Sequence, residues 1–459
     1  MGLDQRIDVA LENLHLQQAL TSVCRGFYTV REQAAAAVPD WEELRSRANA
    51  AKREVIENLP RYLDQLEAAV KARGGQVFRA VDGAAACRYI GEVMSRRNVR
   101  TVVKSKSMAT EEIELNHFLE HAGVEPVETD LGEYIIQLAG EAPFHIIAPS
   151  IHKTRYDVAK LFKEKLNVDL DPNDIPGMCA LARRTLREKF LNAGVGISGV
   201  NMAVAETGTV VIVENEGNAR LCTSVPPVHI AVMGIEKVIP RVPDLAVFLK
   251  LLARSATGQK LSSYTSFLSG PRREGEPDGP EEFHVIFLDN GRSKIQANPR
   301  TREALYCIRC GACLNVCPVY RKIGGHAYPW VYSGPIGAIL SPQIQGLDAE
   351  PKLPFASSLC GACREVCPVK IRIPELLLEL RQTEVETAPQ RHTWERLAFR
   401  IWAWTMQRSW AYELGGLMAR WLGDSMPLGP AAVWAKTREL PKPPANSFRE
   451  LWRKRGSRP

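Results

Sequence analysis

The chain has 459 residues, a net charge of +7 and 45% hydrophobic residues, which is enough for two or three globular domains. The basic residues are scattered along the chain, so the composition argues against a nucleic-acid-binding protein. There is no uncharged apolar run of about 18 residues and no apolar region near the N-terminus, so we expect neither a transmembrane helix nor a secretory signal.

Helical patterns open the chain, and an alternation of strands and helices follows. Residues 5–37 and 41–73 are predicted to be helical, with a break at Pro60 because proline disrupts a helix interior. Predicted strands at 76–80, 100–104, 124–128 and 145–148 alternate with predicted helices at 83–97, 110–122, 131–138, 154–166 and 176–193. More strand-like runs lie at 202–205, 209–214, 229–233 and 283–288. This alternation predicts an α/β fold with a mostly parallel sheet.

Two short motifs in this region are candidate sites. Lys104, Ser105 and Ser107 lie between a predicted strand and a predicted helix, where hydroxyls, cations and backbone N–H groups suit a carboxylate or phosphate. An ordinary polar loop would have the same composition. Glu206 and Thr207 lie in a tight turn between two strand-like runs. They are candidates for catalysis on a substrate hydroxyl, and the alternative is a simple hairpin turn.

Residues 194–199 have the glycine spacing of a dinucleotide-binding loop. That motif requires a strand before it and a helix after it, whereas here a predicted helix precedes and a predicted strand follows. We therefore expect a helix end and a turn at this position. Without a flavin or nicotinamide motif in the chain, hydride chemistry is expected to take place elsewhere in a complex.

Seven of the eleven cysteines lie in two related runs between residues 307 and 367. The first run is Cys307-Ile-Arg-Cys310-Gly-Ala-Cys313-Leu-Asn-Val-Cys317-Pro318, which has the spacing of bacterial iron–sulfur ligands. In two-cluster ferredoxins, the fourth cysteine of such a run ligates the other cluster. The second run repeats the pattern with Cys360, Cys363 and Cys367, and it has Ser357 at the position equivalent to Cys307.

The crossed pattern predicts two adjacent clusters. A [4Fe-4S] cluster is expected on the complete set Cys307, Cys310, Cys313 and Cys367. The second set is Cys317, Cys360 and Cys363, and its fourth position is filled by Ser357, by water or by nothing. The second cluster is thus either [4Fe-4S] or [3Fe-4S]. Structural zinc is the alternative, but it needs neither a third closely spaced cysteine nor the Cys-Pro ending.

The other four cysteines lie far apart in the chain, and most of the tryptophans lie near the C-terminus. Isolated cysteines are expected to pack as small apolar residues, as in a protein of the reducing cytoplasm; they are Cys24, Cys87, Cys179 and Cys222. Seven of the nine tryptophans lie near the C-terminus, at 394, 402, 404, 410, 421, 434 and 452. Three interpretations stay open for this helical tail: packing against the cluster domain, docking of a partner subunit, or peripheral membrane contact.

Several segments together resemble a known family. They are residues 151–155, 196–209 and 214–220, the paired cysteine runs, and the tail ending at 447–452. In this combination the chain resembles the bacterial lactate-utilisation iron–sulfur proteins over nearly its whole length. The resemblance implies an α/β domain similar to sugar-phosphate isomerases and CoA-transferases, followed by a small helical double-cluster ferredoxin-like domain. The implied boundaries are 1–70 (N-terminal helices), 71–295 (α/β domain), 296–385 (cluster domain) and 386–459 (helical extension).

The same resemblance implies a function. The family takes part in oxidising L-lactate to pyruvate with two sister proteins, one of them Cys-rich and similar to heterodisulfide-reductase subunits. The seven cysteines match the family's ligand positions, and a small 2-hydroxy acid is an expected ligand. Two alternatives remain: an isomerase or acyl- or CoA-transfer enzyme with structural or redox-sensing clusters, and a nucleic-acid enzyme with structural clusters.

Overall fold

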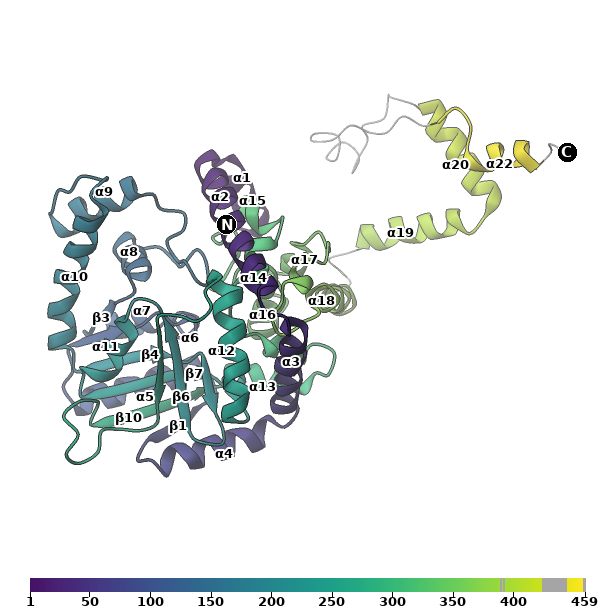
Figure 1. Cartoon of the computed structure of the whole chain (residues 1–459). Coiled ribbons are helices and arrows are strands. Elements are labelled where there is room, and N and C mark those ends of the chain that lie inside the picture. The colour runs from purple at the N-terminus through teal and green to yellow at the C-terminus, as the bar shows by residue number, and fades with distance from the viewer. Residues whose placement is uncertain (389, 391–392, 423–443, 457–459) are drawn as a thin grey trace. The chain divides into compact units, whose positions relative to one another are not determined.

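The computed structural model describes residues 1–388, 390, 393–422 and 444–456 (Figure 1). The chain divides into two compact units, Met1–Gln382 and Thr383–Pro459. None of the helices in the described ranges is both long enough and apolar enough to cross a membrane.

Four helices form the N-terminal part of the first unit. They are α1 (Leu3–Glu12), α2 (Leu14–Ala36), α3 (Trp41–Glu57) and α4 (Leu59–Lys71). The break predicted at Pro60 is confirmed, because Pro60 lies in the first turn of α4, where its missing N–H costs no helical hydrogen bond. Cys24 of α2 is fully buried in the apolar core, as expected for an isolated cysteine, whereas the same expectation is wrong for Cys179, which is exposed.

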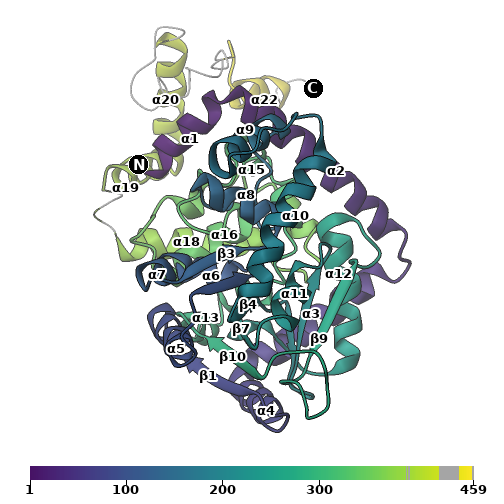
Figure 2. The ribbon, with the colours of Figure 1, turned by 90° about the vertical axis from the view of Figure 1, so that its left-hand side faces the viewer.

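A six-stranded parallel sheet is the centre of the first unit (Figures 1 and 2). In spatial order its strands are β1 (Gln76–Ala80), β10 (Glu282–Leu288), β7 (Val228–Gly234), β4 (Val195–Gly199), β2 (Thr101–Lys104) and β3 (Glu125–Glu128). In register, Val285 of β10 lies between Val77 of β1 and Ala231 of β7. Every residue of β7 is buried, which explains its nearly continuous apolar sequence. The predicted mostly parallel sheet is confirmed.

Helices cover both faces of this sheet. Successive residues of β2 show this, since Val102 packs in one apolar cluster with α5 and α7, and Val103 packs in another with α8, α10 and α11. The helices of this region are α5 (Gly83–Arg96), α6 (Met108–Glu112), α7 (Leu115–His121), α8 (Leu131–Ala139), α9 (Arg155–Leu166), α10 (Ile175–Asn192), α11 (Asn218–Ser224), α12 (Val242–Thr257) and α13 (Arg292–Ala297).

A second, four-stranded sheet has the order β8-β5-β6-β9. Its strands are β5 (Met202–Val204), β6 (Thr209–Glu214), β8 (Val238–Ile239) and β9 (Tyr264–Leu268). The pair β5–β6 is antiparallel, whereas β5–β8 is parallel. The strands predicted at 202–205 and 209–214 therefore exist, but they belong to this separate sheet.

Two local predictions were wrong. The segment His145–Ala148 is a bend instead of a strand, because Nδ1 of His145 accepts hydrogen bonds from the backbone N–H groups of Ile147 and Ala148. Residues 195–199 form strand β4 instead of a helix end and turn. Glycine is needed at position 196 of this strand because a Cβ atom there would lie 1.7 Å from the carbonyl oxygen of Cys222.

Short helices make up the cysteine-rich part of the first unit. They are η2 (Arg302–Tyr306), α14 (Ala312–Val316), α15 (Tyr320–Ile323), α16 (Gly334–Gln345), η3 (Leu353–Phe355), α17 (Ala362–Glu365) and α18 (Ile373–Thr387), of which α18 continues past the end of the unit at Gln382. One continuous apolar core joins them to the N-terminal helices and to the second sheet. The cysteine-rich segment is therefore packed against the α/β part of the unit.

The second unit contains α19 (Thr393–Met406), α20 (Ser409–Leu422) and α22 (Phe448–Gly456). Its aromatic side chains are largely exposed, with Trp394 at 83% and Trp421 at 89%. Trp404 and Trp410 meet edge to face, with ring centroids 5.6 Å apart, and the Arg408 guanidinium lies over the Trp404 ring. Trp434, which belongs to the same tryptophan-rich tail, lies outside the described residues.

Candidate metal centre and adjoining cavity

The first cysteine run begins directly after η2 and contains two residues in the left-handed backbone conformation. Arg309 has φ 60° and Gly311 has φ 73°, and the short helix α14 starts directly after Gly311. A small cavity of about 20 Å³ lies against this run. The thiols that line it are those of Cys307, Cys310, Cys313 and Cys367.

The four thiols around this cavity match the ligand set of an iron–sulfur cluster. The remaining lining of this four-thiol cavity is mostly apolar, including Ile308, Ile336 and Ile371. Backbone N–H groups already donate to the sulfur atoms: Arg309 to Cys307 and Ile371 to Cys367, both at 3.3 Å. Hydrogen bonds of this kind stabilise sulfur-bound iron and tune its reduction potential.

Burial makes these thiols dependent on a bound cation. Burial, followed by repulsion from Cys307 and other neighbouring thiolates, raises the pKa of Cys313 well above its ordinary value. For Cys367, burial raises the pKa to about 11. Thiolates are the iron ligands, so iron would supply the positive charge that four buried thiolates require.

The second cysteine run repeats the backbone of the first. Leu359 has φ 55° and Gly361 has φ 86°, which match Arg309 and Gly311. The N–H of Leu359 donates to Oγ of Ser357 at 3.2 Å, as the N–H of Arg309 donates to Sγ of Cys307. Ser357 therefore occupies the structural position of a first ligand.

The second set of thiols is also gathered in one place. The pKa of Cys363 is raised to about 12, first by burial and then by the neighbouring Cys317 and Cys360. Cys313 of the first set is also raised in pKa by Cys363, so the two sets adjoin each other. In contrast to the first set, the second reaches the surface, because Cys360 is exposed.

A larger cavity of about 380 Å³ lies next to the first set, at the carboxyl ends of the central strands. Its polar lining includes Ser105, Lys106 and Ser107 after β2, Asp130 after β3, Asn201 after β4, and Glu236 and Lys237 after β7. Arg309 lines both this cavity and the four-thiol cavity. In open parallel sheets, ligands bind beyond the carboxyl ends of the strands, so this cavity is placed as a ligand site would be.

Sequence comparisons agree with this arrangement. Family models match the LUD domain at residues 63–288, the 4Fe-4S dicluster domain at 303–371 and the lactate utilisation protein B C-terminal domain at 381–457. The lactate utilization protein B of Bacillus cytotoxicus is 44% identical over 458 residues, which is 98% of this chain and 96% of the relative. Proteins of the same name from Bacillus thuringiensis and Bacillus anthracis match equally well, at 44% identity over 98% of this chain and 96% of each relative.

The chain belongs to the lactate utilisation protein B family. A crystal structure of a DUF162 family protein from Deinococcus radiodurans covers 50% of this chain and 98% of its own, at 15% identity and a TM-score of 0.29. With its 4Fe-4S dicluster domain, this member of the lactate utilisation protein B family is an iron–sulfur protein.

A buried charge network forms one wall of the large cavity in this family member. Glu112 accepts both Nη groups of Arg292 at 2.7 and 2.6 Å, and Glu236 accepts Nε of the same guanidinium at 2.7 Å. Nη2 of Arg309 donates to the other oxygen of Glu236 at 3.2 Å. Burial alone would raise the pKa of Glu236, but Arg292 and Arg309 hold it at about 2. Glu236 is thus a permanent anion that fixes the position of Arg309.

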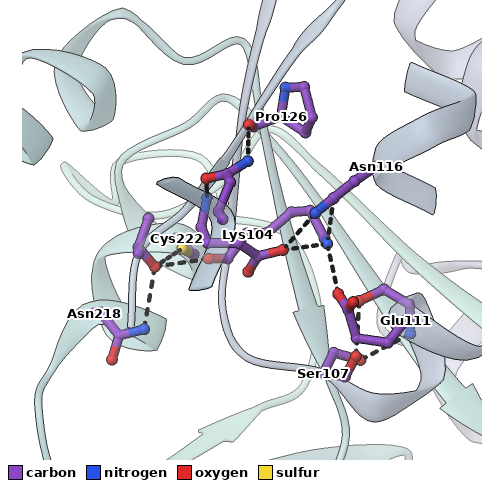
Figure 3. Close-up of polar contacts among 11 residues, drawn as sticks. Lys104, Ser107, Glu111, Asn116, Pro126, Asn218 and Cys222 are labelled. Carbon is purple, nitrogen blue, oxygen red and sulfur yellow. Dashed lines mark hydrogen bonds and ion pairs between the residues drawn. The ribbon is translucent and has the colours of Figure 1, made fainter. Parts of the chain in front are cut away.

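The predicted site residues Lys104, Ser105 and Ser107 do not all lie at the same site in the structure. Ser105 and Ser107 line the cavity, and Ser107 also accepts the N–H of Thr110 at the start of α6. Lys104 is fully buried away from it, and its Nζ donates to Glu128 and Asn116 at 2.5 Å each (Figure 3). Glu128 and its acidic neighbours raise the pKa of Lys104 against the effect of burial. Lys104 therefore ties β2 to β3 and to α7.

The candidate catalytic pair Glu206 and Thr207 lies away from the large cavity. Both residues are in the turn between β5 and β6. Glu206 is exposed, and its carboxylate accepts the N–H of Val242 at the start of α12. Thr207 donates to the hydroxyl of Thr209 at 2.8 Å. Here both side chains stabilise local structure.

Sequence reasoning missed two of the charged residues that line the cavity, Lys237 and Arg309. Lys237 follows β7, and burial and then Arg309 lower its pKa to about 8. Arg309 lies within the first cysteine run, in which only the cysteines were predicted to have a role. The single available signal was the presence of an arginine between two predicted ligands.

Proposed function

We propose that the chain is the iron–sulfur electron-transfer component of an assembly that oxidises L-lactate to pyruvate and so supports growth on lactate. The observation that carries this proposal is the contact between the four-thiol cavity and the large cavity through Arg309, which lines both. The names of the relatives, lactate utilization protein B, support the choice of substrate.

The proposed ligand sets follow the geometry of the two cysteine runs. The first cluster, a [4Fe-4S], would be held by Cys307, Cys310, Cys313 and Cys367. The second, a [4Fe-4S] or [3Fe-4S], would be held by Cys317, Cys360 and Cys363, with Ser357 at the fourth position. When bound, each cluster supplies one-electron transfer.

The electron count fits two such centres. Oxidation of a 2-hydroxy acid to a 2-oxo acid releases two electrons and two protons. Two one-electron centres in one chain match the two electrons released. We assign the breaking of the substrate C–H bond to the assembly formed with two sister proteins, one of them Cys-rich and similar to heterodisulfide-reductase subunits.

An anaerobic reduction experiment tests this function. L-lactate is added to the iron-loaded chain alone, with each sister protein, and with both, and the clusters are followed by electron paramagnetic resonance (EPR). We expect reduction only when both sister proteins are present, with D-lactate as the stereochemical control. A preparation that binds only zinc, or clusters that stay oxidised in the complete mixture, would contradict the proposal.

A second function rests on the same large cavity. Its position at the strand ends also suits an isomerase or an acyl- or CoA-transfer enzyme whose clusters are structural or redox-sensing. Incubation of this chain alone with sugar phosphates and CoA thioesters separates the two functions. Turnover by the isolated chain supports the second, and its absence, together with lactate-dependent reduction in the mixture, supports the first.

A further inference from the structure

Two cations of the large cavity have unused hydrogen-bonding capacity. The side chain of Arg309 is only 8% exposed, yet its Nη1 has no hydrogen-bond partner among the described residues. The guanidinium is held from two other sides, by Glu236 through Nη2 and by the ring of Tyr332, which lies 4.6 Å from Cζ. A buried guanidinium has five N–H donors to satisfy, so the free nitrogen leaves room for an acceptor.

The second cation is Lys237, in the 3₁₀ turn η1 (Ile235–Lys237) directly after β7. Within the residues that the structure describes, its ammonium forms no hydrogen bond and no ion pair, although it lines the cavity. Lys237 and Arg309 are close enough for the arginine to lower the pKa of the lysine. Two neighbouring cations therefore line the same cavity.

The other charged residues of the cavity lining already have partners, including Glu216, whose carboxylate accepts the N–H of Asn215 at 3.1 Å. Arg292 donates to Glu112, to Glu236, to the carbonyl of Asp289 and to the hydroxyl of Tyr332. Lys106 donates to the carbonyl of Ile147 at 2.7 Å. The carboxylate of Asp130 accepts the first N–H groups of α8, and that of Glu214 accepts the N–H groups of Ala219 and Arg220. The cavity lining therefore has positive charge and N–H donors that a bound anion would pair with.

We propose that the large cavity binds a small carboxylate of the 2-hydroxy or 2-oxo acid class against Arg309 and Lys237, and that Arg309 relays its presence to the first cluster. A guanidinium fork matches the two oxygens of a carboxylate. The hydroxyl of Ser105, which has no hydrogen bond among the described residues, and the amide of Asn201 line the same space and suit the adjacent hydroxyl or keto oxygen. A volume of about 380 Å³ admits a small acid and excludes a polymer. This inference rests on the proposed function because it needs a cluster on the first cysteine set.

The relay consists of one residue. Arg309 stands between Cys307 and Cys310, and its backbone N–H donates to Sγ of Cys307 at 3.3 Å. Charge and hydrogen bonds near the sulfur atoms set the potential of an iron–sulfur cluster. A carboxylate on the guanidinium cancels part of its positive charge, so the reduction potential of the first cluster falls. By linkage, reduction of that cluster weakens binding of the anion.

The test uses the full-length, iron-loaded chain under anaerobic conditions. Binding of pyruvate and L-lactate is measured by calorimetry, and a redox titration followed by EPR is run with and without pyruvate. Lys237→Met is the main variant, Arg309→Lys is the conservative one, and Lys163→Met, at an exposed lysine of α9, is the matched control. Lactamide, which has the shape of lactate without its charge, is the ligand control.

We expect pyruvate to bind the wild type and Lys163→Met equally and lactamide to bind neither. Lys237→Met, with unchanged iron content, should bind about tenfold more weakly, which corresponds to about 1.4 kcal/mol. Pyruvate should lower the potential of the first cluster, leave the second unchanged, and lose this effect in Arg309→Lys. Equal affinity of Lys237→Met and wild type, equal binding of lactamide, or a shift of the second cluster alone would overturn the inference. These results do not depend on sister proteins, so they can fail or succeed separately from lactate oxidation.

Discussion

The two cysteine runs are copies of one backbone in two different environments. They are related by a shift of 50 residues, which pairs Arg309 with Leu359 and Gly311 with Gly361, all four in the left-handed region. The contact from the third residue of each run to its first side chain is also repeated. The side chains differ where the runs meet their surroundings.

The first run faces inward and the second outward. Leu314 and Asn315 of the first run are buried, whereas their equivalents Arg364 and Glu365 are exposed. Cys360 is exposed, whereas its equivalent Cys310 is buried and lines the four-thiol cavity. Under the proposed function, electrons therefore enter at the first cluster, next to the substrate cavity, and leave through the second, at the surface where a partner can approach.

The largest expected effect comes from replacing cluster ligands with alanine one at a time, two from each run. If the pairing is crossed, Cys367→Ala removes the same EPR signal as Cys310→Ala, because both thiols line the first cavity. Cys317→Ala removes the same signal as Cys360→Ala. Each change should cost up to about four of about eight irons, by ligand counting. Iron and sulfide analysis checks the counts.

The exposed Cys179 provides the control for this series, since Cys179→Ala should keep both signals. An uncrossed arrangement would group Cys317 with Cys310 and Cys367 with Cys360. That grouping would reject the ligand sets proposed above.

The next effect concerns the single ligand position at which the two runs differ. Ser357→Cys should complete a four-thiolate second set, because Ser357 already holds the geometry of Cys307. If the second cluster has three irons, the count should rise from about seven to about eight per chain. If it already has four, the variant should keep its fourth iron longer in air. Iron analysis and EPR before and after exposure to air measure both.

Ser358→Cys is the matched control, because Ser358 is the adjacent exposed residue. It adds a thiol to the same loop without taking the equivalent position. An identical gain from Ser357→Cys and Ser358→Cys would show that position 357 is not a ligand site.

The two cysteine runs can be found in the sequence because their spacing is a local pattern. The ligand spacing is complete within twelve residues, and the buried strands appear as apolar runs, as in β7 and β10. Prediction failed where a distant contact decides the backbone, as at Gly196, which packs against the carbonyl of Cys222 in α11. His145 and its neighbours look like a strand until the imidazole is seen to fix a bend.

The large cavity could not be predicted from the sequence because it, too, depends on contacts between distant parts of the chain. Lys237 and Arg309 are 72 positions apart in the chain, and each alone looks like an ordinary loop cation. Only the packing of the cysteine-rich segment against the strand ends brings them together. The candidates Ser105 and Ser107 were found because a strand end followed by a helix is itself a local pattern.

A smaller effect is expected in the rates of oxidative damage. The second cluster should be lost several-fold faster than the first in air, because Cys360 is exposed whereas Cys310 and Cys313 are buried. The decay of the two EPR signals in the iron-loaded wild type measures both rates in one sample. The reverse order of loss would contradict the inward and outward assignment of the two runs.

The smallest effect tests the shared left-handed turn. Leu359 has φ 55°, a conformation that costs a residue with a Cβ atom about 1–2 kcal/mol. Leu359→Ala keeps that cost and loses side-chain packing, whereas Leu359→Gly loses the same packing and removes the cost. Glycine costs about 0.5–1 kcal/mol in chain entropy relative to alanine, so the glycine variant should be the more stable by up to about 1.5 kcal/mol. Anaerobic urea unfolding of the iron-loaded variants measures this difference. Greater stability of the alanine variant, which is the usual order in helices and strands, would mean that the turn is not a strained feature common to both runs.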